Sequence, residues 1–102
     1  MYLSVTSKLG NKIRISEERW KLIINTKHPE IRGKENEVHN ALIDPDEVRV
    51  SQSDPAVFLY YKWQEKLSLC VVAKHVNGDG FIITIYFTDR IKEGKEIFRR
   101  ES

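Results

Sequence analysis

The sequence predicts an α+β domain in which an N-terminal hairpin and two helices pack on one face of a mainly antiparallel sheet of four to five strands. Three observations lead to this class. Apolar residues recur at helical spacing in the first half of the chain, alternate with period two from Glu47 onward, and are interrupted there by turn-forming residues at hairpin distances. With 102 residues, the chain is long enough for a single domain, 1–102, with one hydrophobic core.

A hairpin and a helix are predicted first. Residues 2–8 and 12–15 have the pattern of two strands, and Gly10-Asn11 between them suits the positive φ angles of a tight turn. Ser16 can then cap a helix, because its side chain can accept a hydrogen bond from a backbone N–H of the first turn. This helix is expected to end near Lys27, two residues before a proline.

The rest of the chain predicts one more helix and then a series of strands. The second helix is expected from about Lys34 to Ile43, and it ends at Asp44-Pro45. Beyond it, segments of alternating apolar and polar residues are separated by turns rich in Pro, Gly, Asn and Asp. The candidate strands are 47–52, 56–63, 67–75 and 81–88, with a short final strand at Ile97-Phe98.

The alternation also predicts which face of the sheet meets the helices. Leu59, Val71 and Ile85 belong to a nearly apolar set, which is expected to pack against the helices. The opposite face collects hydroxyl and amino groups, so a functional site is expected there. Its predicted members are Tyr60, Lys62, Lys74, Thr84, Tyr86 and Thr88.

Composition narrows the function classes. The formal net charge of +2 is too small to indicate nucleic-acid binding by itself, and no apolar run is long enough to span a bilayer, so no membrane partner is expected. Cys70 is the only cysteine, which makes an intramolecular disulfide impossible and a reducing cytoplasm the expected location. Neither a metal-ligand spacing nor a glycine-rich loop that opens a helix occurs in the sequence, so neither metal nor cofactor is expected.

His28 is the main candidate for chemistry. Cleavage of RNA without a metal needs a base for the 2′-hydroxyl proton, an acid for the leaving 5′ oxygen, and cations that stabilise the phosphate. Histidine suits either proton role. Pro29 restricts the backbone of His28 beside the predicted helix end, which limits the conformations that the residue must lose. The alternative is a surface histidine that only caps the end of the helix.

Three strand residues complete the candidate catalytic set. Lys74 can supply positive charge to a phosphate, although lysines on an exposed sheet face commonly serve only solubility. Tyr86 and Thr88 can orient phosphate oxygens, and tyrosine can also stack on a base. Both residue types are equally favoured in strands for packing reasons, so this alternative stays open.

Candidate RNA contacts lie around the same predicted face. Lys62 and Tyr60 belong to its strands, and Arg90 follows at the end of the polar stripe. Loop arginines and surface lysines are often merely solvated, which is the alternative for Lys62 and Arg90.

Five short motifs, in this order along the chain, resemble a group of small bacterial and phage proteins. They are His-Pro-Glu (28–30), Asp-Pro-Asp (44–46), Tyr-Tyr (60–61), Val-Val-x-Lys (71–74) and Gly-Phe-Ile-Ile-Thr-x-Tyr-Phe-Thr (80–88). That group is usually placed in the barnase, EndoU, colicin and RelE-like ribonuclease superfamily, and the similarity covers about residues 13–98. It implies a RelE/barnase-like fold and a metal-independent ribonuclease, often a toxin with an antitoxin or immunity protein as its partner.

The resemblance also implies roles for single residues. It assigns proton transfer to His28, a phosphate or transition-state cation to Lys74, and positions near the phosphate to Tyr86 and Thr88. The sequence therefore predicts an endoribonuclease, or a ribonuclease-like toxin, that cleaves RNA by transesterification through the 2′-hydroxyl. The alternative is a non-catalytic module that binds RNA or a protein through the polar sheet face and the basic C-terminal tail.

Overall fold

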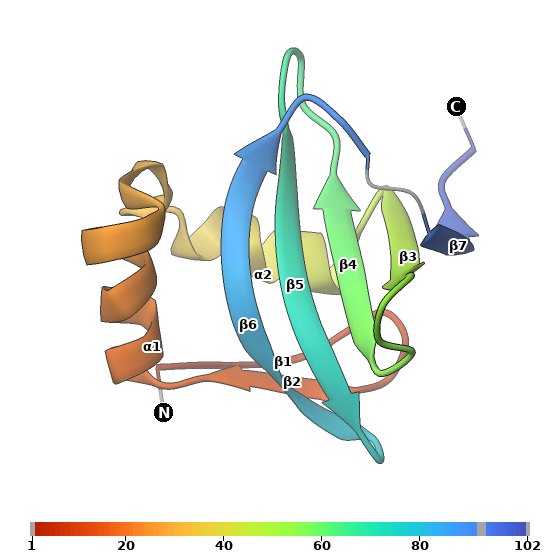
Figure 1. Cartoon of the computed structure of the whole chain (residues 1–102), viewed down its shortest axis with the longest axis horizontal. Helices are drawn as coiled ribbons and strands as arrows, with labels where there is room; N and C mark the ends of the chain where they lie inside the picture. The colour runs from red at the N-terminus through yellow and green to blue at the C-terminus, as the bar shows by residue number, and fades with distance from the viewer. Residues whose placement is uncertain (1, 92–93, 102) are drawn as a thin grey trace.

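Seven strands form one curved mixed sheet in the computed structural model, which describes residues 2–91 and 94–101 (Figure 1). Their order across the sheet is β1-β2-β6-β5-β4-β3-β7. Neighbouring strands are antiparallel except for β2 and β6, which are parallel. The strands are β1 (Leu3–Thr6), β2 (Lys12–Ile15), β3 (Glu47–Ser51), β4 (Val57–Lys62), β5 (Ser68–Val76), β6 (Asp79–Thr88) and β7 (Gly94–Arg99).

The predicted α+β class, with two helices on a four- to five-stranded RelE/barnase-like sheet, is wrong. The described residues form a mostly-sheet fold with two short α-helices. The N-terminal hairpin joins the main sheet because β2 pairs with the start of β6, where Ile13 lies opposite Gly80. A Cβ at position 80 would lie only 2.4 Å from the carbonyl oxygen of Lys74, so this close approach requires glycine. The short final strand predicted at Ile97-Phe98 is part of β7, which pairs with β3 and so also joins the sheet.

A helical arm follows the hairpin and ends against the sheet. It consists of α1 (Glu17–Leu22), the π-helical segment η1 (Ile23–Lys27) and the 3-10 turn η2 (Pro29–Ile31), and α2 (Glu35–Ile43) comes next. Ser16 caps α1 as predicted, since its Oγ accepts a hydrogen bond from the Arg19 N–H at 3.1 Å. His28 leaves helical geometry, with φ −140° and ψ 73°, which confirms the predicted helix end near Lys27.

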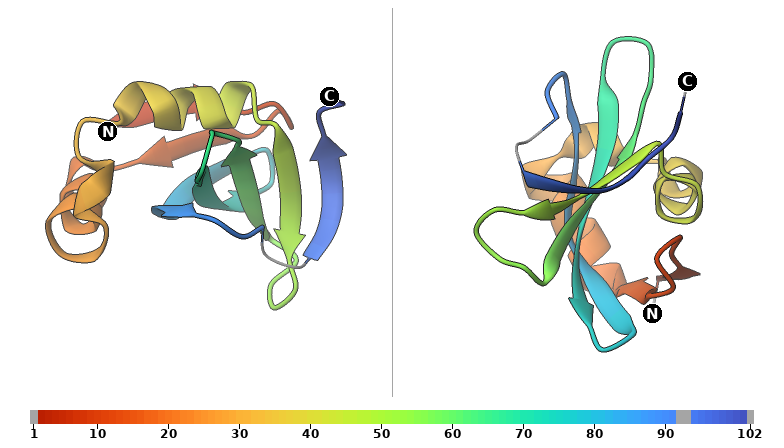
Figure 2. Two further views of the ribbon diagram at one scale, coloured as in Figure 1. Left: turned by 90° about the horizontal axis from the view of Figure 1, so that it is seen from above. Right: turned by 90° about the vertical axis from the view of Figure 1, so that its right-hand side faces the viewer.

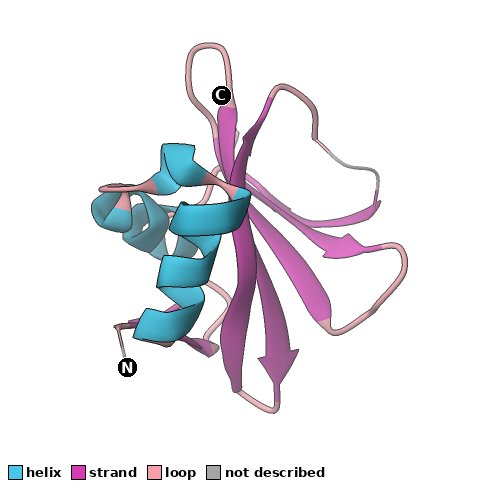
Figure 3. Cartoon of the chain, turned by 60° about the vertical axis from the view of Figure 1, so that its left-hand side comes forward, coloured by secondary structure: helices cyan, strands magenta, loops and turns pink. Residues whose placement is uncertain are grey.

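Both helices lie on the same side of the sheet, and the other side, which we call the open face, carries no helix of the described chain (Figure 2, Figure 3). The main core fills the space between the helices and the sheet. Burying an aliphatic side chain there stabilises the fold by about 1.5–3 kcal/mol. Fully or nearly fully buried core side chains include Trp20, Ile23, Ile31, Val38 and Leu42 from the helical segments and Ile13, Val71 and Ile85 from the strands.

The side chains of β4 that were predicted to face the helices lie on the open face, and those predicted for the open face lie on the helix side. Tyr60 pairs with Val71 and is buried in the core on the helix side, whereas Leu59 and Tyr61 lie on the open face. Lys62 belongs to the same side as Tyr60, because side chains alternate along a strand. The expectation that Tyr60 and Lys62 lie on the polar face is therefore wrong. Large apolar side chains occur at both odd and even positions of β4, so the sequence pattern could not show which set of side chains faces the helices.

A β-bulge at Ile83 interrupts the pairing of β5 with β6. On one side of the bulge Thr84 and Tyr86 lie on the open face, and on the other side Phe81 does so as well. Ile82 enters the core instead, with 2% of its surface exposed. Because of the bulge, Thr84, Tyr86 and Phe81 all lie on the open face, although regular alternation would place Phe81 on the other one.

Tyr60 joins two further polar groups within the core. Its hydroxyl donates to Ser7 Oγ at 2.9 Å and lies 2.8 Å from His75 Nε2. The His75 ring stacks on Phe58, with 3.9 Å between the ring centroids. Burial raises the pKa of Tyr60 to about 12 and lowers the pKa of His75, so both side chains are neutral at pH 7.

The free energy of unfolding should therefore decrease as the pH falls below about 6.5, the pKa of an unperturbed histidine. Because the pKa of His75 is lowered in the folded state, the unfolded state binds more protons in this range and acidification favours unfolding. Urea unfolding between about pH 7.5 and pH 5.5 measures the slope. A His75→Gln variant should lose most of it, whereas the exposed His39 on α2 provides a matched control, His39→Gln. An equal slope in both variants would contradict the assignment.

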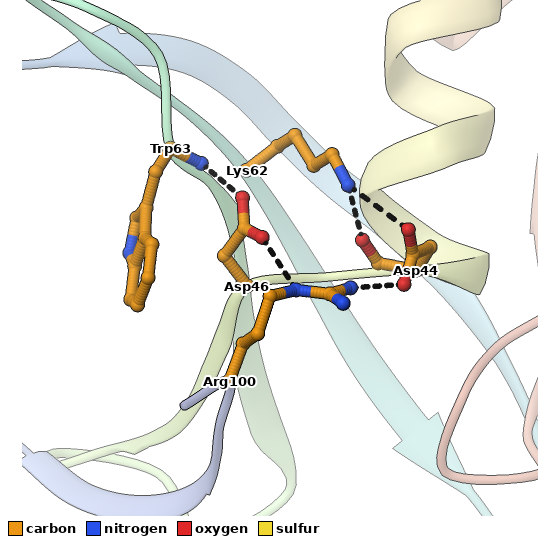
Figure 4. Close-up of polar contacts among 5 residues, drawn as sticks. All are labelled: Asp44, Asp46, Lys62, Trp63 and Arg100. Carbon is orange, nitrogen blue, oxygen red and sulfur yellow. Dashed lines mark hydrogen bonds and ion pairs between the residues drawn. The ribbon is translucent and has the colours of Figure 1, made fainter. Parts of the chain in front are cut away.

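A cluster of ion pairs attaches the C-terminal segment to the end of α2 and to β4 (Figure 4). Asp46 accepts hydrogen bonds from Arg100 Nε at 2.8 Å and from the Trp63 N–H at 2.7 Å. Asp44 pairs with the Arg100 guanidinium and accepts hydrogen bonds from Lys62 Nζ. Arg100, followed by Lys62, lowers the pKa of Asp44, and Asp44 in turn raises the pKa of Arg100.

Replacing Asp46 with Ala should lower the free energy of unfolding by about 1–3 kcal/mol, because the Trp63 N–H loses its charged acceptor. Asp46 is only 7% exposed, so solvent cannot fully replace the carboxylate. Asp46→Asn should be less destabilising, since its carbonyl oxygen can still accept one of the two hydrogen bonds. Urea denaturation measures the change, with Asp89→Ala at an exposed position as the control. A loss no larger than in that control would contradict the role of Asp46.

Candidate functional site

The open face holds a groove of about 330 Å³ beside the loop between β3 and β4. An apolar floor with a few well-placed polar groups is typical of ligand sites. The lining residues are Val57, Leu59 and Val72 on the floor, Ser51 from the end of β3, Gln52 and Ser53 from the loop, and Thr84 and Tyr86 from β6. A larger hollow of about 620 Å³ lies beside Trp63 and beside Arg99 and Arg100, which belong to the basic tail of the non-catalytic alternative, but none of the predicted catalytic residues lines it. We therefore place the candidate site in the groove.

His28 lies beside this groove because the helical arm ends against β6. Its ring centroid is 5.8 Å from that of Tyr86, which lines the groove. Its Nδ1 is 3.4 Å from Glu30 Oε2, and a carboxylate at this position can orient the imidazole ring. The side chain of His28 is 32% exposed, so a ligand at the edge of the groove can reach it.

Tyr86 ends a row of side chains that crosses three strands of the open face. Tyr61 on β4 lies opposite Cys70 on β5, and Cys70 lies opposite Tyr86 on β6. Burial, and after it the neighbouring Cys70, raises the pKa of Tyr86 far above its usual value. The hydroxyl therefore stays protonated at physiological pH. The hydroxyl is buried and interacts with the Cys70 side chain, so it can donate to a ligand oxygen only in place of that contact, and it cannot serve as a base.

Thr84 brings a second hydroxyl to the groove. Its Oγ1 is buried, and no hydrogen-bond partner for it lies in the part of the chain that the structure describes. A buried hydroxyl without a partner costs stability, because it has lost its hydrogen bonds to water. Thr84 lines the groove, but its Oγ1 is buried, so a polar atom of a bound ligand can satisfy it only after neighbouring side chains move.

Replacing Thr84 with Val should raise the free energy of unfolding by about 1 kcal/mol, because a methyl group takes the place of a buried, unsatisfied hydroxyl. Thermal or urea denaturation measures the change. Thr88→Val is the matched control on the same strand, since the Thr88 hydroxyl is hydrogen-bonded and its loss should destabilise the protein. A Thr84→Val variant that is less stable than the parent chain would contradict the unsatisfied state of this hydroxyl.

Of the predicted catalytic residues, the structure brings His28 and Tyr86 together and places Lys74 apart from them. Lys74 lies opposite Val57 at the other end of the groove, and its Nζ is 3.6 Å from Asp54 Oδ2. It is four positions along β5 from Cys70, the partner of Tyr86, which corresponds to about 13 Å. His28 and Lys74 therefore lie at opposite ends of the groove.

Thr88 and Arg90 form a turn just beyond Tyr86. The Thr88 hydroxyl donates to the Arg90 carbonyl at 2.9 Å and accepts from the Arg90 N–H at 3.1 Å. Arg90 is exposed and lies four positions after Tyr86 along the chain. The two residues are thus at the same end of β6 as His28.

Two predicted RNA contacts are directed away from the groove. Tyr60 is buried on the helix side, where it contacts Ser7 and His75. Lys62 lies on that side as well, and its ammonium group donates to the backbone carbonyl and the carboxylate of Asp44. Neither side chain lines the groove.

The loop residues 51–53 and Glu30 are not among the predicted site residues. The loop has the sequence of an ordinary turn, and it reaches the groove only because β3 curves beside β4. Glu30 does carry a sequence signal, since it belongs to the same His-Pro-Glu motif as His28.

No protein-family model, curated protein or solved structure matches the chain. Within residues 2–91 and 94–101, no group of three or more His, Cys, Asp or Glu side chains is placed to hold a metal ion. None of the helices in these ranges has both the length and the apolar character needed to cross a membrane.

Proposed function

We propose that the chain is a metal-independent endoribonuclease that cleaves RNA through attack by its own 2′-hydroxyl. The observation that carries the proposal is the position of the His28 ring beside Tyr86 at the edge of the groove. An acid–base group thus adjoins Tyr86, and Thr84 lines the same groove two positions before it on β6.

Each group has a defined task in the reaction. Neutral His28 accepts the proton of the 2′-hydroxyl while the 2′ oxygen attacks the adjacent phosphorus. The 5′ oxygen then leaves and takes the proton from the imidazolium, so that a 2′,3′-cyclic phosphate and a 5′-hydroxyl form. Glu30 keeps the imidazole ring oriented between these steps. Tyr86 and Thr84 donate hydrogen bonds to the phosphate oxygens, where negative charge increases.

The motifs that resemble the ribonuclease superfamily support the same chemistry, because His28, Glu30, Thr84 and Tyr86 belong to them. The resemblance also motivates a further part of the proposal. For a toxin, this is an antitoxin or immunity protein that covers the groove until the enzyme is released, whereas the proposed cytoplasmic location rests on Cys70 as the only cysteine.

Replacing His28 with Ala should lower the rate of RNA cleavage about 100- to 10,000-fold, the usual contribution of a general acid–base group. The assay uses mixed-sequence RNA and purified protein in the presence of a chelator, and the products are tested for a cyclic phosphate end. His39→Ala, at an exposed position on α2, is the matched control and should cleave like the parent chain. Equal rates for the His28 and His39 variants would refute the assignment of His28.

A non-catalytic module that binds RNA is the second candidate. It is favoured by the position of Lys74, the predicted transition-state cation, at the far end of the groove from His28. In that case RNA stays intact in the same assay but binds the protein, with an affinity that falls steeply as salt increases.

A further inference from the structure

A row of side chains on the open face continues beyond the groove toward the N-terminal hairpin. Val57, which lines the groove, lies opposite Lys74, and Lys74 lies opposite Phe81. Phe81 in turn lies opposite Arg14 in the parallel pair of β6 with β2. Four strands therefore place an aromatic ring between two cations, next to the groove.

Phe81 presents an aromatic surface to solvent. It is 45% exposed, although it is followed by two isoleucines in a strongly apolar strand. The bulge at Ile83 causes this exposure, because it sends Ile82 into the core in place of Phe81. An exposed ring of this kind can stack on a nucleic acid base.

Arg14 and Arg19 line a hollow of about 360 Å³ that also contains Phe81 and Ser16. The Arg14 Nε is buried, and no hydrogen-bond partner for it lies among the described residues. Another nitrogen of its guanidinium is 3.4 Å from Asp79, whose side chain is 55% exposed. Lys74 has a similar exposed partner, Asp54. Solvent-exposed pairs of this kind are weak, so a phosphate can replace or share the carboxylate.

We infer that Arg14, Phe81 and Lys74 form a second contact for single-stranded RNA, at a nucleotide distant from the cleaved bond. A base stacks on Phe81, and the flanking phosphates contact Arg14 and Lys74. Phe81 is five positions from Tyr86 along β6, which corresponds to about 16 Å, so the two contacts belong to different nucleotides. The inference rests on the proposed function, and it gives Lys74 a binding task in place of a catalytic one.

The geometry favours single strands over duplex RNA. A base can reach the Phe81 ring only when it is unstacked from its own strand, and paired bases in an A-form helix are not free to do so. Thr84 lines the groove and Phe81 lines the neighbouring hollow on the same strand, so an extended chain along β6 would contact both.

Binding of a labelled single-stranded RNA 12-mer with 2′-O-methyl riboses tests the inference, because this probe cannot be cleaved and does not depend on the role of His28. Phe81→Ala should weaken its affinity about 5- to 150-fold, the range for loss of one stacked base. Phe81→Trp should retain the affinity. Leu67→Ala, at a similarly exposed apolar position in the loop between β4 and β5, is the matched control and should bind normally. Circular dichroism confirms that the variants are folded.

Two further measurements separate this contact from the catalytic site. Arg14→Gln should reduce the slope of log affinity against log salt by about 0.7, as expected for one lost phosphate contact to a single strand. A dinucleotide substrate should be cleaved equally by the parent chain and by Phe81→Ala, whereas cleavage of the 12-mer with natural riboses should show a raised KM in the variant.

Unchanged 12-mer affinity in Phe81→Ala, or equal binding of duplex RNA, would overturn the second contact. If the parent chain cleaves RNA through His28 but Phe81→Ala leaves the KM of the 12-mer unchanged, the inference fails and the proposed function stands. If the 12-mer binds through Phe81 but His28→Ala cleaves like the parent chain, the catalytic proposal fails and the second contact stands.

Discussion

The pairing of β5 with β6, and the bulge at Ile83 within it, is the constraint on which the open face depends. Side chains on a regular strand alternate between faces, so Thr84 and Tyr86 could not share a face with Phe81 in an uninterrupted β6. The extra residue in the bulge moves Phe81 to the same face as Thr84 and Tyr86. The same shift sends Ile82 into the core, where it is almost fully buried, and this burial opposes any slip in register.

The position of His28 depends on a second constraint, the end of the helical arm. Pro29 stops the helix, and Ile31 two residues later is fully buried, so the chain is fixed on both sides of the histidine. The ring is thereby held against Tyr86 while about a third of it stays accessible. Such a residue loses little conformational freedom when a substrate binds, which favours a role in proton transfer.

Charge on this protein is organised as pairs and not as a strongly basic surface. Lys74 lies beside Asp54, Arg14 beside Asp79, and Arg100 beside two aspartates. The first two pairs are exposed and lie on the open face, whereas the third attaches the C-terminal segment to the end of α2. A low net charge is therefore compatible with phosphate contacts, because a phosphate can exchange with a weakly held carboxylate.

The sequence by itself determined the local features: the cap at Ser16, the helix end before Pro29 and most of the strand positions. These depend on residues close in the chain, where propensity and sterics act directly. Only the tertiary structure decided that all seven strands join one sheet, which face Tyr60 and Lys62 occupy, and that His28 lies beside Tyr86 but apart from Lys74. Strand pairing joins segments that are distant in the chain, so the local sequence does not specify it. A single bulge exchanges the faces of all the following side chains on its strand, and a strand with apolar residues at both odd and even positions gives no signal for either face.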